Sequence, residues 1–280
     1  MINLQEGRAG FETINTYPAA GHITRKNTTI AGVPGAWFLP EHPVSDDIVI
    51  YIHGGAFIFG SIDSHASLVS HITHHLKRKV LVIDYRLAPE HPFPAGINDC
   101  VAVIQALYQE DPGIRFGIIG DSAGGNLAMA TQLKLKEKRG PGAQYTVVIS
   151  PWVNLECNTQ SYDRNKTQDT VLARPYLVEA VALYAAGQPA NMPMLSPVHG
   201  DFSGLAPVLI LCGTHEILED DSKQLHQQLQ NCGVETVLHL FNNQLHVWPF
   251  MEIDTEASQL ALDHITGFVN KHAETTTKVS

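Results

Sequence analysis

Short apolar segments alternate along the chain with stretches of helical spacing and with loops rich in glycine and proline. Most of these segments consist of β-branched and aromatic residues, which is typical of strands buried on both faces. We predict strands at residues 48–52, 80–84, 116–119, 145–150, 207–212 and 234–241. We predict helices at residues 65–77, 95–109, 126–138, 175–186, 218–231 and 256–272. Strands that alternate with helices indicate an α/β fold with a mostly parallel central sheet and helices on both faces.

Three further segments complete the predicted organisation of one domain over residues 1–280. Residues 1–22 form an N-terminal arm with a short helix, and residues 23–40 form strands broken by a turn at 32–35. Strand signals stop between residues 152 and 201, where the helix at 175–186 starts with a proline in its first turn. We interpret residues 152–201 as an insertion that makes a small helical cap over the carboxyl ends of the strands.

The first candidate catalytic motif is residues 120–125. They have the sequence Gly-Asp-Ser-Ala-Gly-Gly and lie between a predicted strand and a predicted helix. A serine in such a turn fits the nucleophile elbow, where small neighbours let strand and helix approach closely. The alternative is a plain glycine-rich turn, because so short a pattern also occurs by chance. Ser122 is the candidate nucleophile.

A serine nucleophile needs a base, and the base needs an acid that fixes its tautomer. In hydrolases that carry this elbow, the acid and then the histidine follow the serine along the chain. Glu216 leaves a predicted strand at the expected place, and of the 15 histidines only His246 lies in a loop after a later strand. Acids at the start of the next helix, at positions 219–221, compete with Glu216 but are typical helix-dipole partners.

A second glycine-rich loop follows the strand at residues 48–52 and reads His-Gly-Gly-Ala at residues 53–56. Its amides can turn toward an oxyanion, and the amide of Ala123 can add a further donor. We therefore predict an oxyanion hole from Gly54, Gly55, Ala56 and Ala123; the alternative is a loop without a catalytic role. His53 precedes the serine and is interpreted as a structural residue.

Composition narrows the classes of partner. The formal net charge is −10, from 18 basic and 28 acidic residues, without a basic cluster, which argues against nucleic acid and anionic membrane surfaces. The four cysteines are scattered and indicate neither a disulfide framework nor a zinc site, and His71 with His75 supplies only two of the ligands a metal needs. With neither a signal peptide nor a membrane span in view, we expect a cytoplasmic protein.

Several motifs together resemble the bacterial hormone-sensitive-lipase-like esterases. They are the loop at 53–57 with Gly60 and His65, the run Asp-Tyr-Arg-Leu-Ala-Pro-Glu-His-Pro-Phe-Pro-Ala at 84–95, the elbow, Ser-Pro-Trp-Val at 150–153, and Leu-Ser-Pro at 195–197. The resemblance covers roughly residues 49–272. It implies an α/β-hydrolase fold, Ser122 as nucleophile, His246 as general base, no metal or cofactor, and hydrolysis of short- to medium-chain carboxylic esters. It is also compatible with a homodimer.

The chain departs from the family pattern at two informative positions. The acid is usually an aspartate followed by proline, whereas this chain has Glu216 and Ile217, and the third glycine of the oxyanion loop is Ala56. Four aromatic residues near motif positions are candidates for the substrate pocket, with ordinary core packing as the alternative: Phe57, Phe59, Trp152 and Trp248. Two other functions remain open, namely an amidase such as an arylformamidase with the same triad, and a non-catalytic small-ligand receptor.

Overall fold

The computed structural model describes residues 2–14 and 17–273. Eight strands form one sheet in the order β1-β2-β4-β3-β5-β6-β7-β8. Both contacts of β2 are antiparallel, with β1 and with β4, and the strands from β4 to β8 are parallel. The strands are β1 (Ile23–Ile30), β2 (Val33–Pro40), β3 (Ile48–Ile52), β4 (Lys79–Ile83), β5 (Phe116–Asp121), β6 (Thr146–Ile149), β7 (Val208–Gly213) and β8 (Thr236–Phe241).

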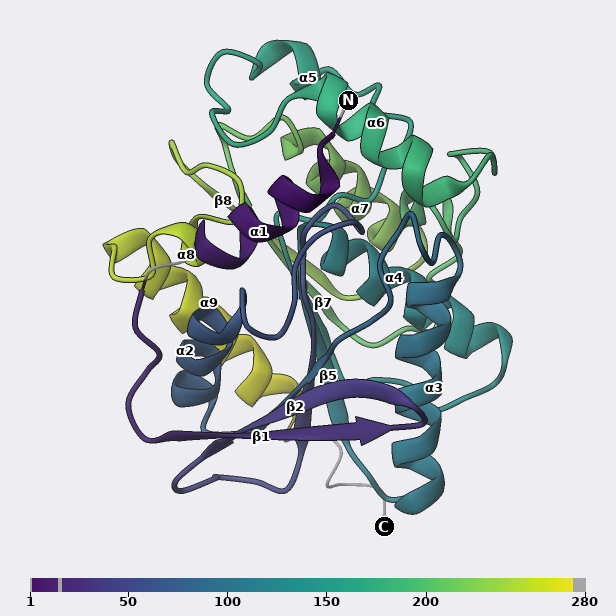
Figure 1. Ribbon diagram of the computed structural model, residues 1–280. Helices are drawn as coiled ribbons and strands as arrows, with labels where there is room; N and C mark the ends of the chain where they lie inside the picture. Colours follow the sequence, from purple (N-terminus) through teal and green to yellow (C-terminus); the bar gives the residue numbers. More distant parts are fainter. Residues whose placement is uncertain (1, 15–16, 274–280) are drawn as a thin grey trace.

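Helices cover both faces of the sheet, as predicted. One apolar core includes residues of α3, α4 and α7, and the other includes residues of α2, α8 and α9 (Figure 1). The helices are α1 (Leu4–Ile14), α2 (Ala66–Leu76), α3 (Ala95–Glu110), α4 (Ser122–Glu137), α5 (Ser161–Arg164), α6 (Arg174–Ala185), α7 (Glu219–Asn231), α8 (Trp248–Met251) and α9 (Glu256–Ala273), with a 3₁₀ turn η1 (Pro197–His199).

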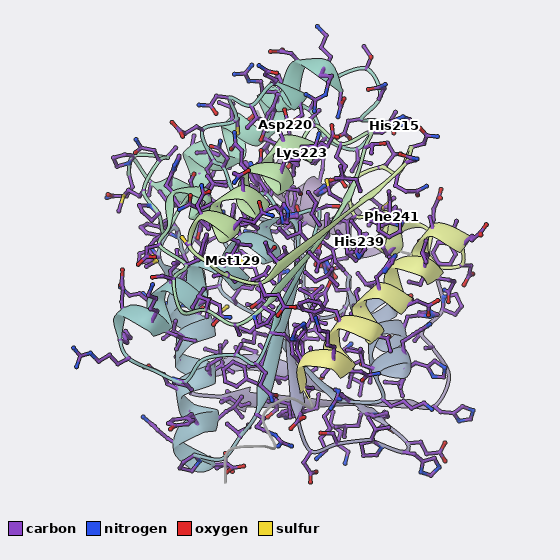
Figure 2. All side chains as sticks on the ribbon, turned by 180° about the vertical axis from the view of Figure 1, so that it is seen from behind. Met129, His215, Asp220, Lys223, His239 and Phe241 are labelled. Carbon is purple, nitrogen blue, oxygen red and sulfur yellow. The ribbon has the colours of Figure 1, made fainter. Side chains whose placement is uncertain are left out.

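Two segments lie over the carboxyl ends of the parallel strands. The insertion, residues 152–201, carries α5 and α6 at the top of Figure 1, and α1 of the arm lies below them. The view from behind shows the same end of the sheet, with His215 in the loop after β7 (Figure 2). In open α/β sheets the ligand site lies outside this edge.

The structure corrects two local predictions. The turn between the first two strands is at Ala31 and Gly32, and Pro34 and Gly35 belong to β2. A Cβ on Gly35 would lie 2.7 Å from the carbonyl oxygen of Val82, so this glycine serves strand packing and not the turn. Helix α4 begins at Ser122, four residues before the predicted start, because close packing against β3 offsets the low helix propensity of the glycines.

Candidate active site

The elbow places Ser122 between β5 and α4 in a left-handed backbone conformation, with φ of 52°. Two glycines make that turn sterically feasible. A Cβ on Gly120 would lie 2.4 Å from the carbonyl oxygen of Gly124, and one on Gly124 would lie 2.0 Å from that of Ile52. The strained turn therefore depends on small residues, and it presents Ser122 to a cavity at the carboxyl end of the sheet.

The candidate base and acid approach Ser122 from loops that follow β8 and β7. His246 Nε2 lies 2.8 Å from Ser122 Oγ, and His246 Nδ1 lies 2.9 Å from Glu216 Oε2. The three residues are separated by 94 and 30 positions along the chain, yet their side chains form one continuous hydrogen-bonded line. Glu216 is fully buried, so its carboxylate depends on neighbouring donors in place of water.

Those donors come from two neighbouring strand ends. Ser150 Oγ donates to Glu216 Oε1 at 2.7 Å, and the amide of Gly213 donates to the same oxygen at 2.5 Å. Ser150 Oγ also accepts the amide hydrogen of Val247 at 3.0 Å, which ties the acid to the residue after His246. Sequence reasoning gave Ser150 no role; its place at the carboxyl end of a predicted strand was the available signal.

The predicted oxyanion loop divides into two parts. Gly55 and Ala56 line the cavity with φ of 114° and 53°, and Ala123 follows Ser122 in the first turn of α4. The prediction for Gly54 needs correction, because its amide already donates to Asp121 Oδ1 at 3.0 Å. A buried amide with a protein partner is not free for a substrate oxygen, so the candidate donors are those of Gly55, Ala56 and Ala123.

A buried polar cluster of Tyr51, His65 and Asp121 supports this loop, because Asp121 accepts the Gly54 amide. Tyr51 Oη donates to Asp121 Oδ1 at 2.7 Å, and His65 Nε2 lies 3.5 Å from Asp121 Oδ2. Burial alone would raise the pKa of Asp121, but His65 and Tyr51 outweigh it and the pKa is lowered. Burial lowers the pKa of His53 to about 3, so this histidine is neutral and structural.

The cavity beside Ser122 has a volume of about 400 Å³, within the range of small-molecule sites. Its walls are largely apolar and come from α1, the oxyanion loop, the insertion and α8. The apolar lining residues include Phe11, Ile14, Phe59, Val171, Leu172, Tyr176, Leu177, Val247, Phe250 and Met251.

Of the four aromatic residues predicted to line the substrate pocket, Phe59 lines this cavity and the other three do not. Phe57 stacks on Tyr184 with ring centroids 3.8 Å apart, and Trp152 packs in the same region with its ring centroid 5.5 Å from that of Phe57. Trp248 is buried against Phe241. All three belong to the core, because their large side chains pack into the apolar layers beside the sheet and not into the opening above it.

The arm contributes to the cavity although α1 has no buried residue. Arg8 holds the helix in place: its guanidinium donates to the carbonyl oxygens of Ile58 and Ala88 and forms two hydrogen bonds with Glu90. The ion pair lowers the pKa of Glu90 to about 2. Phe11 and Ile14 are thereby kept at the cavity wall.

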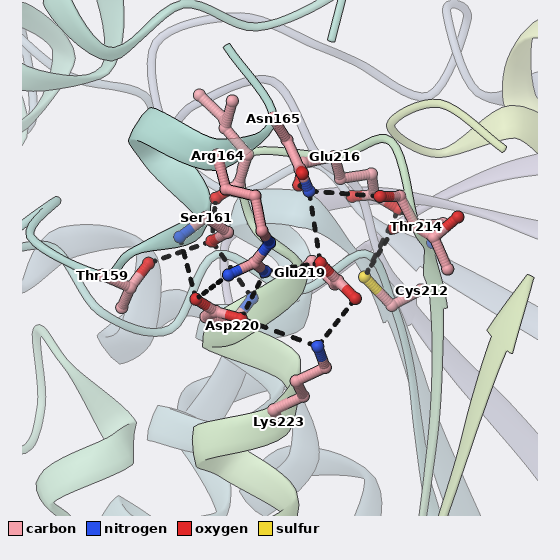
Figure 3. A network of polar contacts seen from close by, with 12 residues as sticks. Thr159, Ser161, Arg164, Asn165, Cys212, Thr214, Glu216, Glu219, Asp220 and Lys223 are labelled. Atoms are coloured by element: carbon pink, nitrogen blue, oxygen red, sulfur yellow. Dashed lines mark hydrogen bonds and ion pairs between the residues drawn. The ribbon is translucent and has the colours of Figure 1, made fainter. Parts of the chain in front are cut away.

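The acids that compete with Glu216 have other partners (Figure 3). Glu219 and Asp220 form ion pairs with Arg164 and Lys223 at the start of α7. Asp221 accepts the amide of Asn154 at 3.0 Å, and burial raises its pKa well above the usual range. None of these three contacts His246 in the hydrogen bonds of the described residues.

Among the other candidate groups, the Cys212 thiol touches the triad, with its Sγ atom 3.6 Å from Glu216 Oε1, whereas the histidine pair lies on α2. His75 Nδ1 lies 2.9 Å from the carbonyl oxygen of His71, so the two rings do not face a common ligand. Within residues 2–14 and 17–273, no group of three or more histidine, cysteine, aspartate or glutamate side chains could hold a metal. The four cysteines are free thiols. No helix of the described chain is both long and apolar enough to cross a bilayer.

A family model and individual relatives both indicate the same fold. Residues 49–250 match the model of a family described as having the alpha/beta hydrolase fold. An acetyl-hydrolase of Streptomyces hygroscopicus is 36% identical over 221 residues, covering 79% of this chain and 74% of the relative. An esterase of Acinetobacter venetianus is 33% identical over 230 residues, covering 80% and 75%.

Solved structures agree over nearly the whole chain. An esterase from the bacterial hormone-sensitive lipase family superposes with a TM-score of 0.93 at 32% identity, covering 97% of this chain and 92% of that one. An esterase/lipase from an uncultured bacterium has a TM-score of 0.91 at 30% identity, with the same coverage. The chain therefore belongs to the hormone-sensitive-lipase-like esterases of the α/β-hydrolase fold, and it is a carboxylic ester hydrolase.

Proposed function

We propose that the protein hydrolyses small-molecule carboxylic esters with Ser122 as nucleophile, His246 as general base and Glu216 as the acid that orients the histidine. The observation that carries the proposal is the unbroken contact from Ser122 Oγ to His246 Nε2 at 2.8 Å and from His246 Nδ1 to Glu216 Oε2 at 2.9 Å. Those distances lie within direct proton-transfer reach.

The reaction follows from this geometry. His246 Nε2 takes the hydroxyl proton as Ser122 Oγ attacks the ester carbonyl, and Glu216 stabilises the imidazolium that forms. The amides of Gly55, Ala56 and Ala123 are the proposed donors to the developing oxyanion. The imidazolium then gives its proton to the departing alkoxide, which leaves an acyl group on Ser122. Water, deprotonated by His246, attacks that acyl group, and Ser122 Oγ recovers its proton as the acid is released.

The cavity supports a preference for short to medium acyl chains. Its lining is largely apolar and includes residues of α1 and residues 171–173, 176 and 177 of the insertion. An acyl chain gains roughly 0.8 kcal/mol for each buried methylene until it meets those walls. We also propose that the arm at residues 1–22 and the insertion at residues 152–201 act as the cap of a single catalytic domain.

The direct experiment is Ser122→Ala with p-nitrophenyl esters of increasing acyl length. We expect kcat to fall by at least about 10⁴-fold, because the covalent step is lost. Ser203→Ala is the matched control, since Ser203 is exposed and bonded to Lys136. Undiminished turnover by Ser122→Ala would refute the assignment. Turnover of a matched anilide at a rate equal to the ester would favour the amidase alternative.

A further inference from the structure

The acid is carried by an irregular loop, residues 214–218, between β7 and α7. We call these residues the acid loop. Its first part is held by the end of β8 and the segment after it, because the amides of Thr214 and His215 donate to the carbonyl oxygens of Phe241 and Gln244. Its second part, which includes Glu216 and Ile217, contacts the insertion.

Asn165 of the insertion binds two carbonyl oxygens of this loop. Its Nδ2 atom donates to Glu216 O at 2.7 Å and to Thr214 O at 3.1 Å (Figure 3). The same atom lies 3.2 Å from a carboxylate oxygen of Glu219. Asn165 is buried, so water does not replace these bonds when they are lost. The Asn165 amide thus adds side-chain hydrogen bonds to the longer backbone bonds that Glu216 makes with Gly213 and Glu219.

Asp169 binds the acid loop at Ile217, the residue after Glu216. Its Oδ2 atom accepts the amide hydrogen of Ile217 at 2.8 Å, and its Oδ1 atom accepts those of Val171 and Leu172 at 3.0 and 2.8 Å. Val171 and Leu172 line the cavity. One buried carboxylate therefore joins the residue after the acid to the cavity wall. The family pattern has proline after the acid, which has no amide hydrogen; isoleucine brings one, and Asp169 accepts it.

We propose that Asn165 and Asp169 are positioning residues for the triad acid, so that the insertion fixes the catalytic geometry as well as bounding the cavity. This inference rests on the proposed role of Glu216. The side chain of Glu216 must reach His246 Nδ1 at 2.9 Å and Gly213 N at 2.5 Å from one backbone position. A shift of that backbone by about 1 Å would break these contacts, and misplacement on that scale can cost about 100-fold in rate.

The outer part of the same network provides a control. Arg164 lies on α5 next to Asn165, but it binds only the side chains of Glu219 and Asp220, and its own side chain is 43% exposed. Within the described chain, none of its hydrogen bonds reaches a backbone atom of the acid loop. Substitution of Arg164 therefore removes a contact between the insertion and α7 and leaves the contacts to residues 214–217 in place.

The first test compares Asn165→Asp with Arg164→Gln on p-nitrophenyl butyrate. Asn165→Asp is nearly isosteric but turns an oxygen toward two carbonyl oxygens, so we expect kcat to fall about 10- to 100-fold with KM within about threefold. The rate of inactivation by diethyl p-nitrophenyl phosphate, which reports activation of Ser122, should fall in parallel. Arg164→Gln should stay within about twofold of the parent in both.

The second test isolates Asp169 by a double-mutant cycle. Asp169→Asn should lower kcat about 10-fold, and by clearly less when Ile217→Pro has already removed the amide hydrogen that Asp169 accepts. Equal factors in both backgrounds would overturn the role of Asp169. If Asn165→Asp does not fold, Asn165→Ala replaces it with the same expectation.

Two results would overturn the proposal as a whole. One is kcat unchanged in folded Asn165 and Asp169 variants; the other is a rise in KM alone, which would limit the insertion to shaping the cavity. The underlying function is tested separately. If Ser122→Ala is inactive while these variants keep full kcat, the inference fails and the proposed triad stands.

Discussion

Glu216→Gln changes one oxygen of a fully buried carboxylate into a hydrogen-bond donor, and the surroundings of Glu216 make the consequence calculable. Three strong donors face this carboxylate, and the Cys212 thiol, with Sγ 3.6 Å from Oε1, is a weak fourth. The strong donors are the Nδ1 hydrogen of His246, the amide of Gly213 and the hydroxyl of Ser150, which donates because a carboxylate oxygen can only accept. A glutamine offers only one oxygen to these groups.

Either orientation of the new amide is unfavourable. With its NH₂ toward His246, the ring must accept at Nδ1 and carry its proton on Nε2, which removes the base from Ser122. With its NH₂ toward Gly213, two donors oppose each other in a fully buried site, which costs about 1–3 kcal/mol. In trypsin-like serine proteases, the wrong histidine tautomer that follows an aspartate-to-asparagine change in the triad costs about 10⁴-fold in kcat. We therefore expect kcat to fall about 10²- to 10⁴-fold, or about 3–5 kcal/mol.

The assay is kcat and KM for p-nitrophenyl butyrate, with thermal unfolding followed by circular dichroism on the same samples. Asp220→Asn is the matched control, because Asp220 bonds Arg164 and Lys223 and does not contact His246. We expect its kcat within about twofold of the parent. A Glu216→Gln enzyme that keeps more than a tenth of the parent kcat, or a larger loss in Asp220→Asn, would refute the assignment of the acid.

Two predictions concern stability. Gly124→Ala should destabilise by about 1–3 kcal/mol in urea unfolding, because its Cβ would lie 2.0 Å from Ile52 O, whereas Gly267→Ala, with open space around it, should not destabilise. Burial lowers the pKa of His53 to about 3, so the unfolded chain binds a proton that the fold excludes. Stability should therefore fall from pH 6.5 downward by up to about 1.4 kcal/mol per unit, and His53→Gln should flatten that slope; equal slopes would contradict it.

Much of the fold could be predicted from the sequence. Continuous β-branched segments such as residues 48–52 keep their side chains out of water only when both faces of the strand are buried. That pattern, with helical spacing between the segments, predicted the parallel sheet and its two helical layers. Chain order and position after a strand selected Ser122, Glu216 and His246 for one edge of the sheet, since the carboxyl ends of parallel strands meet there. The structure brings these three side chains into contact, while their catalytic roles remain proposals.

Other features depended on which groups meet in space. The sequence could not show that the Gly54 amide is taken by Asp121, because the two residues are 67 positions apart. Nor could it separate Phe57 or Trp248 in the core from Phe59 or Phe250 at the cavity, since all four are aromatic residues in similar local contexts.

The sequence by itself determined which residue types follow each strand, and hence the fold, the candidate triad and the chemistry it can perform. Only the tertiary structure decided how these residues are supported: Ser150 beside the acid, Asn165 and Asp169 from the insertion, and Phe11 and Ile14 from the arm. The reason is physical. Strand and helix preferences are set by neighbours along the chain, whereas the partner of a buried polar group is set by whatever distant segment satisfies its hydrogen bond.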